Sequence, residues 1–329
     1  MKLSLNEFFT DNAVLPHGKP LRIYGEAEGE VEVTLGGSSV KTRAHGEWCV
    51  TLPPMECGGP YTLTVKCGDE SETRENILIG EVILIFGQSN IQFKLRETAD
   101  SPDTFITNGA VRLFTVDRPE AGEHFKTADG WVTLNKETAG EWSALGYYIA
   151  DEITRTVGIA VGLIACYQGA SMIQSWLPEE VAGRESLYVD TKLRHGDYTD
   201  FPIWNRDGFL YNTMLSRVIP YPINRAVYYQ GESNTTEEEG RVYAELLEAL
   251  IDTIRNGVSD GQLPVTVVQI ADLDARNDEG WRAIQRAQLK VTHLTENVRT
   301  VISADISETD NIHPPTKRPL AMRIVKSFE

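Results

Sequence analysis

After about residue 75, short apolar runs alternate along the chain with stretches of helical periodicity. Apolar residues recur at helical spacing over 145–153 and over 242–254, and Gly257 is a suitable end for the second helix. The alternation predicts a parallel sheet with helices on both sides, whose ligands bind beyond the carboxyl ends of the strands. The apolar runs contain few polar residues, which predicts strands buried on both faces, at 83–86, 161–165, 226–229, 265–268 and 300–302.

The first 70 residues have a different rhythm. Apolar and polar residues alternate at period two, as over 31–35, and turn formers such as Gly36-Gly37 separate the runs. This pattern predicts a small antiparallel β domain with one face in water. The polar stretch 68–75 is typical of a linker, so we expect a β-sandwich-like domain over 1–75 and a catalytic domain over 76–329.

Composition disfavours several classes of function. With 329 residues, 41% of them apolar, the chain can form one large domain and one small one. It contains no apolar window of about 18 residues and no N-terminal secretory signal, so we expect a soluble cytoplasmic protein. A formal net charge of −17 makes nucleic acid and anionic membranes poor partners but leaves neutral sugars open.

The four cysteines do not indicate a metal site. Cys49, Cys57, Cys67 and Cys166 form no C-x-x-C pair and have no histidine at zinc-ligand spacing. We therefore expect reduced thiols and no bound metal, with Cys166 packing as a small apolar residue.

A serine stands where the first buried strand is expected to end. The apolar run 82–86 leads into Gly87-Gln88-Ser89-Asn90, and α/β enzymes place nucleophiles at such turns. Asp310 lies three residues before His313, close enough for its carboxylate to orient the imidazole. The other five histidines have no acidic residue at this offset. Serine, aspartate and histidine are thus available for nucleophilic catalysis.

Each of these residues also has a structural alternative. Ser89 is a suitable N-cap for a following helix, and Ile91 stands where the G-x-S-x-G motif of α/β-hydrolases has its second glycine. Asp310 and His313 can form a loop-capping pair before two prolines, and Asp305 is a rival for the acidic role.

Gly169 and Gln230 follow predicted strands as well. With Ser89 and Asp310, they place four candidates on one rim of the expected sheet. The side-chain amide of Gln230 is what an oxyanion site needs, although the segment 230–234 is also compatible with an ordinary strand-to-helix turn.

Four motifs occur in an order typical of one known family. They are Gly87-Gln88-Ser89-Asn90, the segment 161–164 leading to Gly169, Tyr-Tyr-Gln-Gly-Glu-Ser-Asn at 228–234 and Asp-Asn-Ile-His-Pro-Pro at 310–315. Together they resemble the sialate O-acetylesterase-like branch of the SGNH hydrolases, and the resemblance runs from about residue 8 to the end. It implies a flavodoxin-like, three-layer α/β/α fold with a parallel sheet, preceded by a small antiparallel β domain.

The resemblance also implies a role for each matching residue. Ser89 is the nucleophile, His313 is the general base and acid, and Asp310 orients the imidazole. The oxyanion hole consists of the backbone N–H groups of Ser89 and Gly169 and the side-chain amide of Gln230. The mechanism needs no metal or organic cofactor, because the acetyl group moves to Ser89 and water then releases it. The residues expected to bind substrate are Gln88, Asn90, Glu232, Trp176 and Trp204.

The implied substrate and partner is an acetylated carbohydrate, either a sialic acid or a plant oligosaccharide such as acetylated xylan. A sialic acid carboxylate needs a cation, for which Arg194 and Arg206 are candidates. The chain departs from the family pattern at Ala170-Ser171 and at Ile91, and neither change removes a reacting group. The alternatives are a catalytically silent carbohydrate-binding protein and an esterase for another acyl ester. The complete set of reacting residues favours an enzyme.

Overall fold

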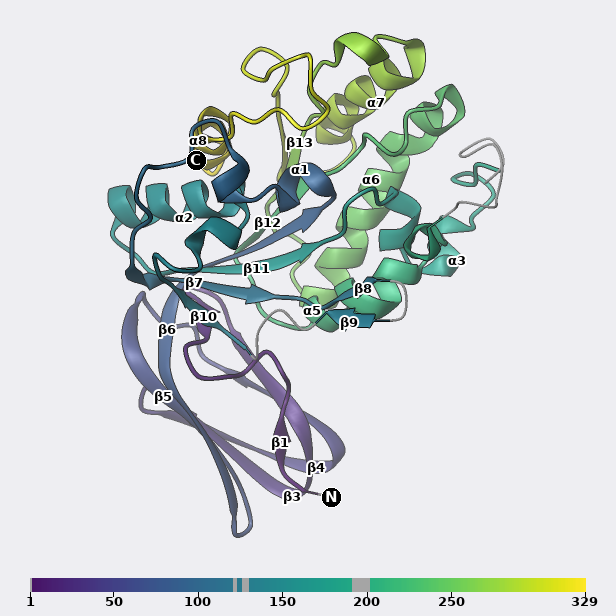
Figure 1. Cartoon of the computed structure of the whole chain (residues 1–329). Helices are drawn as coiled ribbons and strands as arrows, with labels where there is room; N and C mark the ends of the chain where they lie inside the picture. The colour runs from purple at the N-terminus through teal and green to yellow at the C-terminus, as the bar shows by residue number, and fades with distance from the viewer. Residues whose placement is uncertain (1, 121–122, 126–129, 191–201) are drawn as a thin grey trace.

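The N-terminal region forms a mostly antiparallel sheet, in which β2 alone of the pairs described for this region runs parallel to its neighbour β6 (Figure 1). The computed structural model describes residues 2–120, 123–125, 130–190 and 202–329. The residues expected to alternate do so, since the odd positions of 31–35 are buried and the even ones are not, and Gly36-Gly37 forms the turn after them. The strands of this region are β1 (Ser4–Leu5), β2 (Val14–Pro16), β3 (Leu21–Leu35), β4 (Ser38–Leu52), β5 (Gly58–Cys67) and β6 (Glu70–Gly87).

Strand β6 belongs to both halves of the molecule. The linker predicted at 68–75 is wrong, because this segment is a tight turn followed by the first part of β6, which pairs antiparallel with β5 from Cys67 and Glu70 onward. The strand then continues without a break to Gly87 in the second region. The predicted boundary between residues 75 and 76 therefore falls within one continuous strand. Polar residues at 68–75 reflect an exposed strand with alternating burial, not a flexible connection.

The second region is built on a largely parallel sheet with β6 at its centre. The order of its strands is β10-β7-β11-β6-β12-β13-β14, and β10 at the edge is antiparallel. The five apolar runs of the sequence correspond to strands, so a parallel core sheet with antiparallel N-terminal strands is confirmed. Their bounds, with those of β7 and β10, are β7 (Asn108–Thr115), β10 (Val132–Leu134), β11 (Val161–Tyr167), β12 (Arg225–Tyr229), β13 (Val265–Val268) and β14 (Val298–Val301).

Helices cover both faces of this sheet (Figure 1). From β6 the chain runs to β7 and β10 at one edge of the sheet and then returns to β11 beside β6, whereas from β12 it proceeds to β13 and β14 toward the other edge. Helices α2 (Ala144–Val157) and α8 (Arg318–Lys326) pack together, as do α6 (Glu237–Val258) and α7 (Glu279–Lys290). None of the described helices combines the length and apolarity needed to cross a membrane.

Shorter elements complete the described part of the chain. A two-stranded ribbon pairs β8 with β9. These elements are β8 (Arg118–Glu120), β9 (Glu123–Phe125), α1 (Ser89–Gln92), α3 (Glu179–Ala182), α5 (Ser216–Val218), η1 (Leu95–Glu97), η2 (Ala139–Glu141), η3 (Ile173–Trp176), η5 (Ile203–Asn205), the π-helical η6 (Tyr211–Leu215), η7 (Asp274–Arg276) and η8 (Val291–His293).

Helix α6 ends one residue later than the sequence predicts. Its last residue is Val258, and Ser259 adopts the left-handed conformation after it, with φ of 56°. Gly257 lies inside the helix for a packing reason, because a Cβ at this position would come within 2.7 Å of Ile219 Cβ. At the other end, Thr236 and Glu239 form a reciprocal capping box, which satisfies two backbone donors of the first turn.

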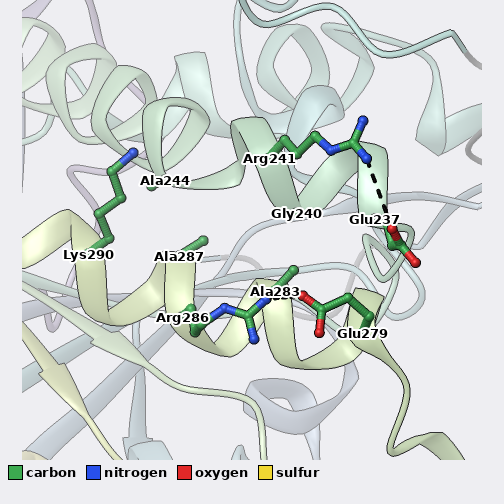
Figure 2. Close-up of a pocket in the computed structure, with 9 residues that line it drawn as sticks. All are labelled: Glu237, Gly240, Arg241, Ala244, Glu279, Ala283, Arg286, Ala287 and Lys290. Atoms are coloured by element: carbon green, nitrogen blue, oxygen red, sulfur yellow. Dashed lines mark hydrogen bonds and ion pairs between the residues drawn. The ribbon is translucent and has the colours of Figure 1, made fainter.

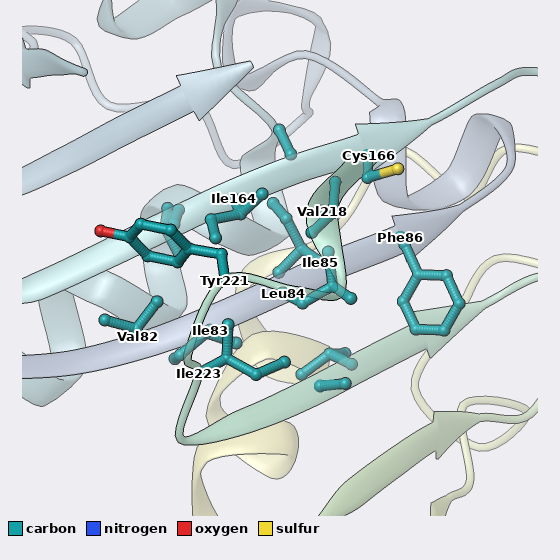
Figure 3. Packing of buried hydrophobic residues seen from close by; sticks show 14 of the residues in the cluster. Val82, Ile83, Leu84, Ile85, Phe86, Ile164, Cys166, Val218, Tyr221 and Ile223 are labelled. Carbon is teal, nitrogen blue, oxygen red and sulfur yellow. The ribbon is translucent and has the colours of Figure 1, made fainter. Parts of the chain in front are cut away.

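The hydrophobic core is continuous around β6. Residues 82–86 are at most 1% exposed, and Val218, Tyr221 and Ile223 pack against this strand (Figure 3). The Tyr221 hydroxyl donates a hydrogen bond of 2.8 Å to the carbonyl of Val14 in the N-terminal sheet, so this core reaches both regions. Strand β6 is therefore a rigid base for the turn that follows it.

Candidate active site

Three predicted site segments begin at the carboxyl ends of three adjacent strands. Ser89 follows β6, Gly169 follows β11 on one side of it, and Gln230 follows β12 on the other. The register places Gly87 between Tyr167 and Tyr229. The connection after β6 leads to β7 on one side of the sheet, and the connection after β12 leads to β13 on the other side. Open α/β sheets bind ligands at such a point.

Glycine is required at the end of β6. Gly87 has φ of 130°, and a Cβ there would overlap the Tyr229 carbonyl oxygen and lie 2.7 Å from its carbon. The absence of a side chain lets β6 and β12 lie close together while the backbone turns into α1. Gln88, not Ser89, occupies the N-cap position of α1, so the capping alternative for the serine does not apply.

The structure brings Ser89 and His313 together across 224 residues of sequence. Nε2 of the imidazole lies 2.7 Å from the Ser89 hydroxyl oxygen. Two hydrogen bonds hold the loop that carries His313. The His313 backbone N–H donates to Asn311 Oδ1, and the Asn90 side chain donates to the Ile312 carbonyl. A base in this position can take the hydroxyl proton directly.

The imidazole is held in an environment that favours its neutral form. Burial lowers the pKa of His313, and the nearby Lys317 cation lowers it further. A neutral imidazole is the form that accepts a proton, so both effects support a general base near neutral pH.

We expect the activity of this site to persist below the usual titration range of histidine. Protonation of His313 abolishes its basicity, so kcat/KM falls as the pH drops through the pKa of the imidazole. Because that pKa is lowered, the low-pH limb of the kcat/KM profile should lie below about pH 6.5. Initial rates at low substrate concentration, measured over a series of pH values, give the position of this limb. A limb above the ordinary pKa of histidine would contradict a lowered pKa for His313.

The structure does not bring Asp310 to the imidazole. Its side chain is exposed, and among the described residues it forms no hydrogen bond with His313. Asp310 is also not among the charges that shift the pKa of His313. The rival Asp305 is engaged elsewhere, in a two-bond ion pair with Arg323 at 2.5 and 3.0 Å. The orienting role of Asp310 stays a prediction that this geometry does not support.

Two backbone donors are available for an oxyanion. Within the described ranges, the N–H groups of Ser89 and Gly169 donate to no other protein group. A Cβ built on Gly169 would lie 3.9 Å from Ser89 Cβ, so the two residues are neighbours. Asn205 braces the loop after Gly169, because its side chain donates to the Ala170 carbonyl and accepts from the Met172 N–H, both at 2.9 Å.

The Gln230 amide is already committed to the protein. Its Nε2 donates hydrogen bonds of 2.8 Å to the Ser171 carbonyl and to Asn234 Oδ1, and its Oε1 lies 2.6 Å from the Tyr243 hydroxyl. The Ser171 carbonyl can only accept, which fixes the orientation of the amide. Both N–H protons are therefore used, so the structure corrects the predicted oxyanion role. Gln230 instead supports the loop that carries Gly169.

Four of the five predicted substrate-binding residues are buried. Gln88, Asn90, Glu232 and Trp176 are between 0% and 8% exposed, so the predicted sugar contacts are corrected to internal ones. Asn90 and Glu232 bond to each other at 2.6 Å, and the Trp176 indole donates to Ser171 Oγ at 3.0 Å. Gln88 accepts from the Gly231 N–H and so joins the ends of β6 and β12.

Trp204, the fifth predicted substrate contact, packs against the hydrophobic core. It is partly exposed and lies next to Asn205, which braces the Gly169 loop. Arg206 is exposed two residues after it, whereas Arg194 lies outside the described residues. Among the predicted substrate contacts that the structure describes, Trp204 and Arg206 are therefore the ones with solvent-exposed surface, and their role stays a prediction.

A separate groove of about 440 Å³ lies between α6 and α7 (Figure 2). Small residues allow the two helices to approach closely, and charged residues of both signs form the rim. It contains none of the residues predicted for catalysis. The lining residues are Glu237, Gly240, Arg241, Ala244, Glu279, Ala283, Arg286, Ala287 and Lys290.

Sequence reasoning missed Lys317 and Asn205. Lys317 is 1% exposed, although a lysine after two prolines is ordinarily a surface residue. Its only sequence signal is a place four residues after His313, in the same loop segment. Asn205 gives no local signal, since it supports a loop 35 residues earlier.

Comparisons with known proteins show which family this chain resembles. A family model described as carbohydrate esterase, sialic acid-specific acetylesterase matches residues 80–323. The sialate O-acetylesterases of Pongo abelii and Homo sapiens are each 25% identical over 353 aligned residues, covering 94% of this chain. The chain spans 66% of the length of those two relatives.

A solved structure has the same fold over nearly the whole chain. A carbohydrate acetylesterase from Xanthomonas citri superposes with a TM-score of 0.85 and 27% identity, covering 98% of this chain and 74% of that one. The family model covers most of the chain, including the turn that carries Ser89 and the loop that carries His313. The chain therefore belongs to the carbohydrate esterase family of sialic acid-specific acetylesterases.

Proposed function

We propose that this protein is a serine esterase that removes O-acetyl groups from a carbohydrate through an acetyl-enzyme intermediate. The observation that carries the proposal is the 2.7 Å contact between His313 Nε2 and the Ser89 hydroxyl at the carboxyl end of β6. Two unused backbone donors beside that hydroxyl, at Ser89 and Gly169, supply the second requirement of acyl transfer.

The reaction follows from these positions. Ser89 Oγ attacks the acetyl carbonyl carbon while His313 Nε2 takes the hydroxyl proton, and the two backbone N–H groups stabilise the oxyanion. The C–O bond to the sugar then breaks, and the imidazolium gives its proton to the leaving sugar oxygen. Water next attacks the acetyl group on Ser89 and loses a proton to His313. Acetate leaves, and the proton returns to Ser89.

The substrate is an acetylated carbohydrate, with an O-acetyl sialic acid and an acetylated plant oligosaccharide such as xylan as the two candidates. Similarity to sialate O-acetylesterases supports an O-acetyl sialic acid as the substrate. Similarity to a carbohydrate acetylesterase is compatible with other acetylated sugars as well. Arg206 is the exposed cation near Trp204 that a sialate carboxylate can use.

A substrate panel tests the proposal. Acetate release is measured from p-nitrophenyl acetate, O-acetyl sialic acid, acetylated xylan oligosaccharides and a long-chain acyl ester. Release from at least one acetylated sugar, with poor hydrolysis of the long-chain ester, is the expected result. No hydrolysis of any ester would leave a silent carbohydrate-binding protein, and a preference for the long-chain ester would favour the other acyl-esterase class.

We expect Asp310→Ala to retain most of the activity. The exposed carboxylate makes no contact with the imidazole in the described structure, so its removal should lower kcat/KM by less than about tenfold, whereas an orienting carboxylate contributes about ten-thousandfold in the Ser-His-Asp template. Steady-state kinetics of Asp310→Ala, with Asp305→Ala as the matched control, tests whether Asp310 orients the imidazole. A loss of several hundredfold in the Asp310 variant alone would restore the sequence-predicted triad.

A further inference from the structure

A lysine is buried directly behind the reacting serine and histidine. Lys317 is 1% exposed, and its Nζ donates a 2.7 Å hydrogen bond to Asn90 Oδ1. Asn90 itself is 1% exposed and follows the nucleophile in sequence. Its Nδ2 donates to Glu232 Oε1 at 2.6 Å and to the Ile312 carbonyl at 3.0 Å. The network therefore joins the residue after Ser89 to the residue before His313.

The chemistry of the partners fixes the Asn90 amide in one orientation. A lysine ammonium can only donate, so it requires the Asn90 carbonyl oxygen. The Ile312 carbonyl can only accept, so it requires the amide nitrogen. A reversed amide would face like partners on both sides and lose these hydrogen bonds inside the protein, where unsatisfied polar groups are costly. Lys317 thus selects the orientation in which Asn90 holds the histidine loop.

We propose that Lys317 is a positioning residue of the esterase site, which locks Asn90 so that its amide holds the Ile312 carbonyl and keeps the His313 imidazole over Ser89. This inference rests on the function proposed above and deepens it. In the described structure the Lys317 ammonium bonds to Asn90 and makes no hydrogen bond with Ser89, so it acts through Asn90. Glu232 accepts the second N–H of the Asn90 amide and so completes the hydrogen-bond network.

Charges around the network explain why a cation persists there. Burial lowers the pKa of Lys317 to about 8, opposed by the carboxylates of Glu232, Glu308 and Asp100 from three other segments. Asp100 accepts hydrogen bonds from the backbone N–H groups of Lys317 and Arg318, which fastens the start of α8. The same cation faces His313 and opposes its protonation. Removing it should therefore make the imidazole easier to protonate.

The test compares Lys317→Met with Lys326→Met, an exposed lysine at the far end of the same helix. In Lys317→Met, we expect kcat/KM to fall about tenfold to a hundredfold through kcat, because a displaced base loses its geometry while substrate contacts stay. The low-pH limb of kcat/KM should also move to higher pH. The control should match the wild type in both. A folded Lys317→Met enzyme with unchanged kcat and an unchanged limb would overturn the proposal.

A second variant separates positioning from simple stability. Lys317→Met leaves the Glu232 carboxylate buried without its cation, and Lys317→Met/Glu232→Gln removes that charge. We expect the double variant to recover thermal stability but not kcat, since Asn90 Oδ1 still has no donor. Recovery of both would mean that the lysine serves stability alone and would overturn the proposal.

Failure of the proposed function remains distinguishable from failure of this inference. If the wild type hydrolyses no ester, the esterase proposal fails, and the His313 imidazole is then titrated by NMR in wild type and Lys317→Met. A higher imidazole pKa in the variant, with weaker contact between His313 and Ser89, supports the positioning role. Identical titrations and contacts in the two proteins overturn it.

Discussion

Ser89→Ala should lower kcat for ester hydrolysis by about a thousandfold to a millionfold, with a folded protein and a nearly unchanged KM. Without the hydroxyl no acetyl-enzyme forms, and only the oxyanion donors remain to assist direct attack by water. His313→Ala should lose about as much, since the hydroxyl that contacts Nε2 at 2.7 Å is a weak nucleophile without its base.

The double variant Ser89→Ala/His313→Ala gives the sharper result. Because the two groups act as one unit, the double loss should be close to the larger single loss and not to the product of the two. Ser233→Ala is the matched control, as it removes another serine hydroxyl from the rim without touching the imidazole. Multiplicative losses, or an equal loss in the control, would contradict a Ser89–His313 unit.

Gly87→Ala should destabilise the protein by about 3 kcal/mol or more and also disable the site. The backbone has φ of 130°, which side chains rarely adopt, and the added methyl group would overlap the Tyr229 carbonyl. Relief requires β6 and β12 to separate, and the turn that carries Ser89 would move with them. Denaturant unfolding and kcat of the residual folded protein measure the two effects.

Gly18→Ala is the control without a steric clash. Gly18 also has a positive φ, of 65°, but a Cβ there meets nothing within 4 Å. Its substitution should cost only about 1 kcal/mol and leave kcat unchanged. Equal destabilisation by the two alanines would show that the contact with Tyr229 does not matter.

The proximity of Ser89 and His313 could be anticipated from the sequence because each residue stands in a short motif that points to the same rim of the sheet. A run of five apolar residues ending in glycine specifies a buried strand and a tight turn, and His313 stands in a motif of its own. The parallel order of the strands then brings their carboxyl ends together whatever the separation along the chain. The mixed α/β fold with its parallel core sheet, and the position of Ser89 at the end of β6, therefore follow from patterns a few residues long.

The roles of buried polar residues were not accessible in the same way. A sequence shows that Gln230 has an amide, but not that Ser171 and Asn234 use both of its protons. Likewise, the burial of Lys317 depends on Asn90 in helix α1 and on Glu232 after β12, which provide an acceptor and a counter-charge. Such assignments depend on which partners the fold assembles.

The polar first part of β6 misled for a related reason. Alternating acidic and small residues at 70–75 are compatible with a linker and with an exposed strand, and only the pairing with β5 decides between them. The continuity of β6 also bears on function. The nucleophile turn sits at the end of a strand that is also anchored in the N-terminal sheet, which suits a site that depends on fixed geometry.

The most direct test of the central claim is covalent labelling with a fluorophosphonate, followed by peptide mapping. An activated serine attacks such a reagent far faster than an ordinary hydroxyl. The account predicts one label per chain, located on Ser89, with esterase activity lost in proportion and with labelling strongly slowed in His313→Ala. A label on another residue, or full activity in a protein labelled at Ser89, would contradict it.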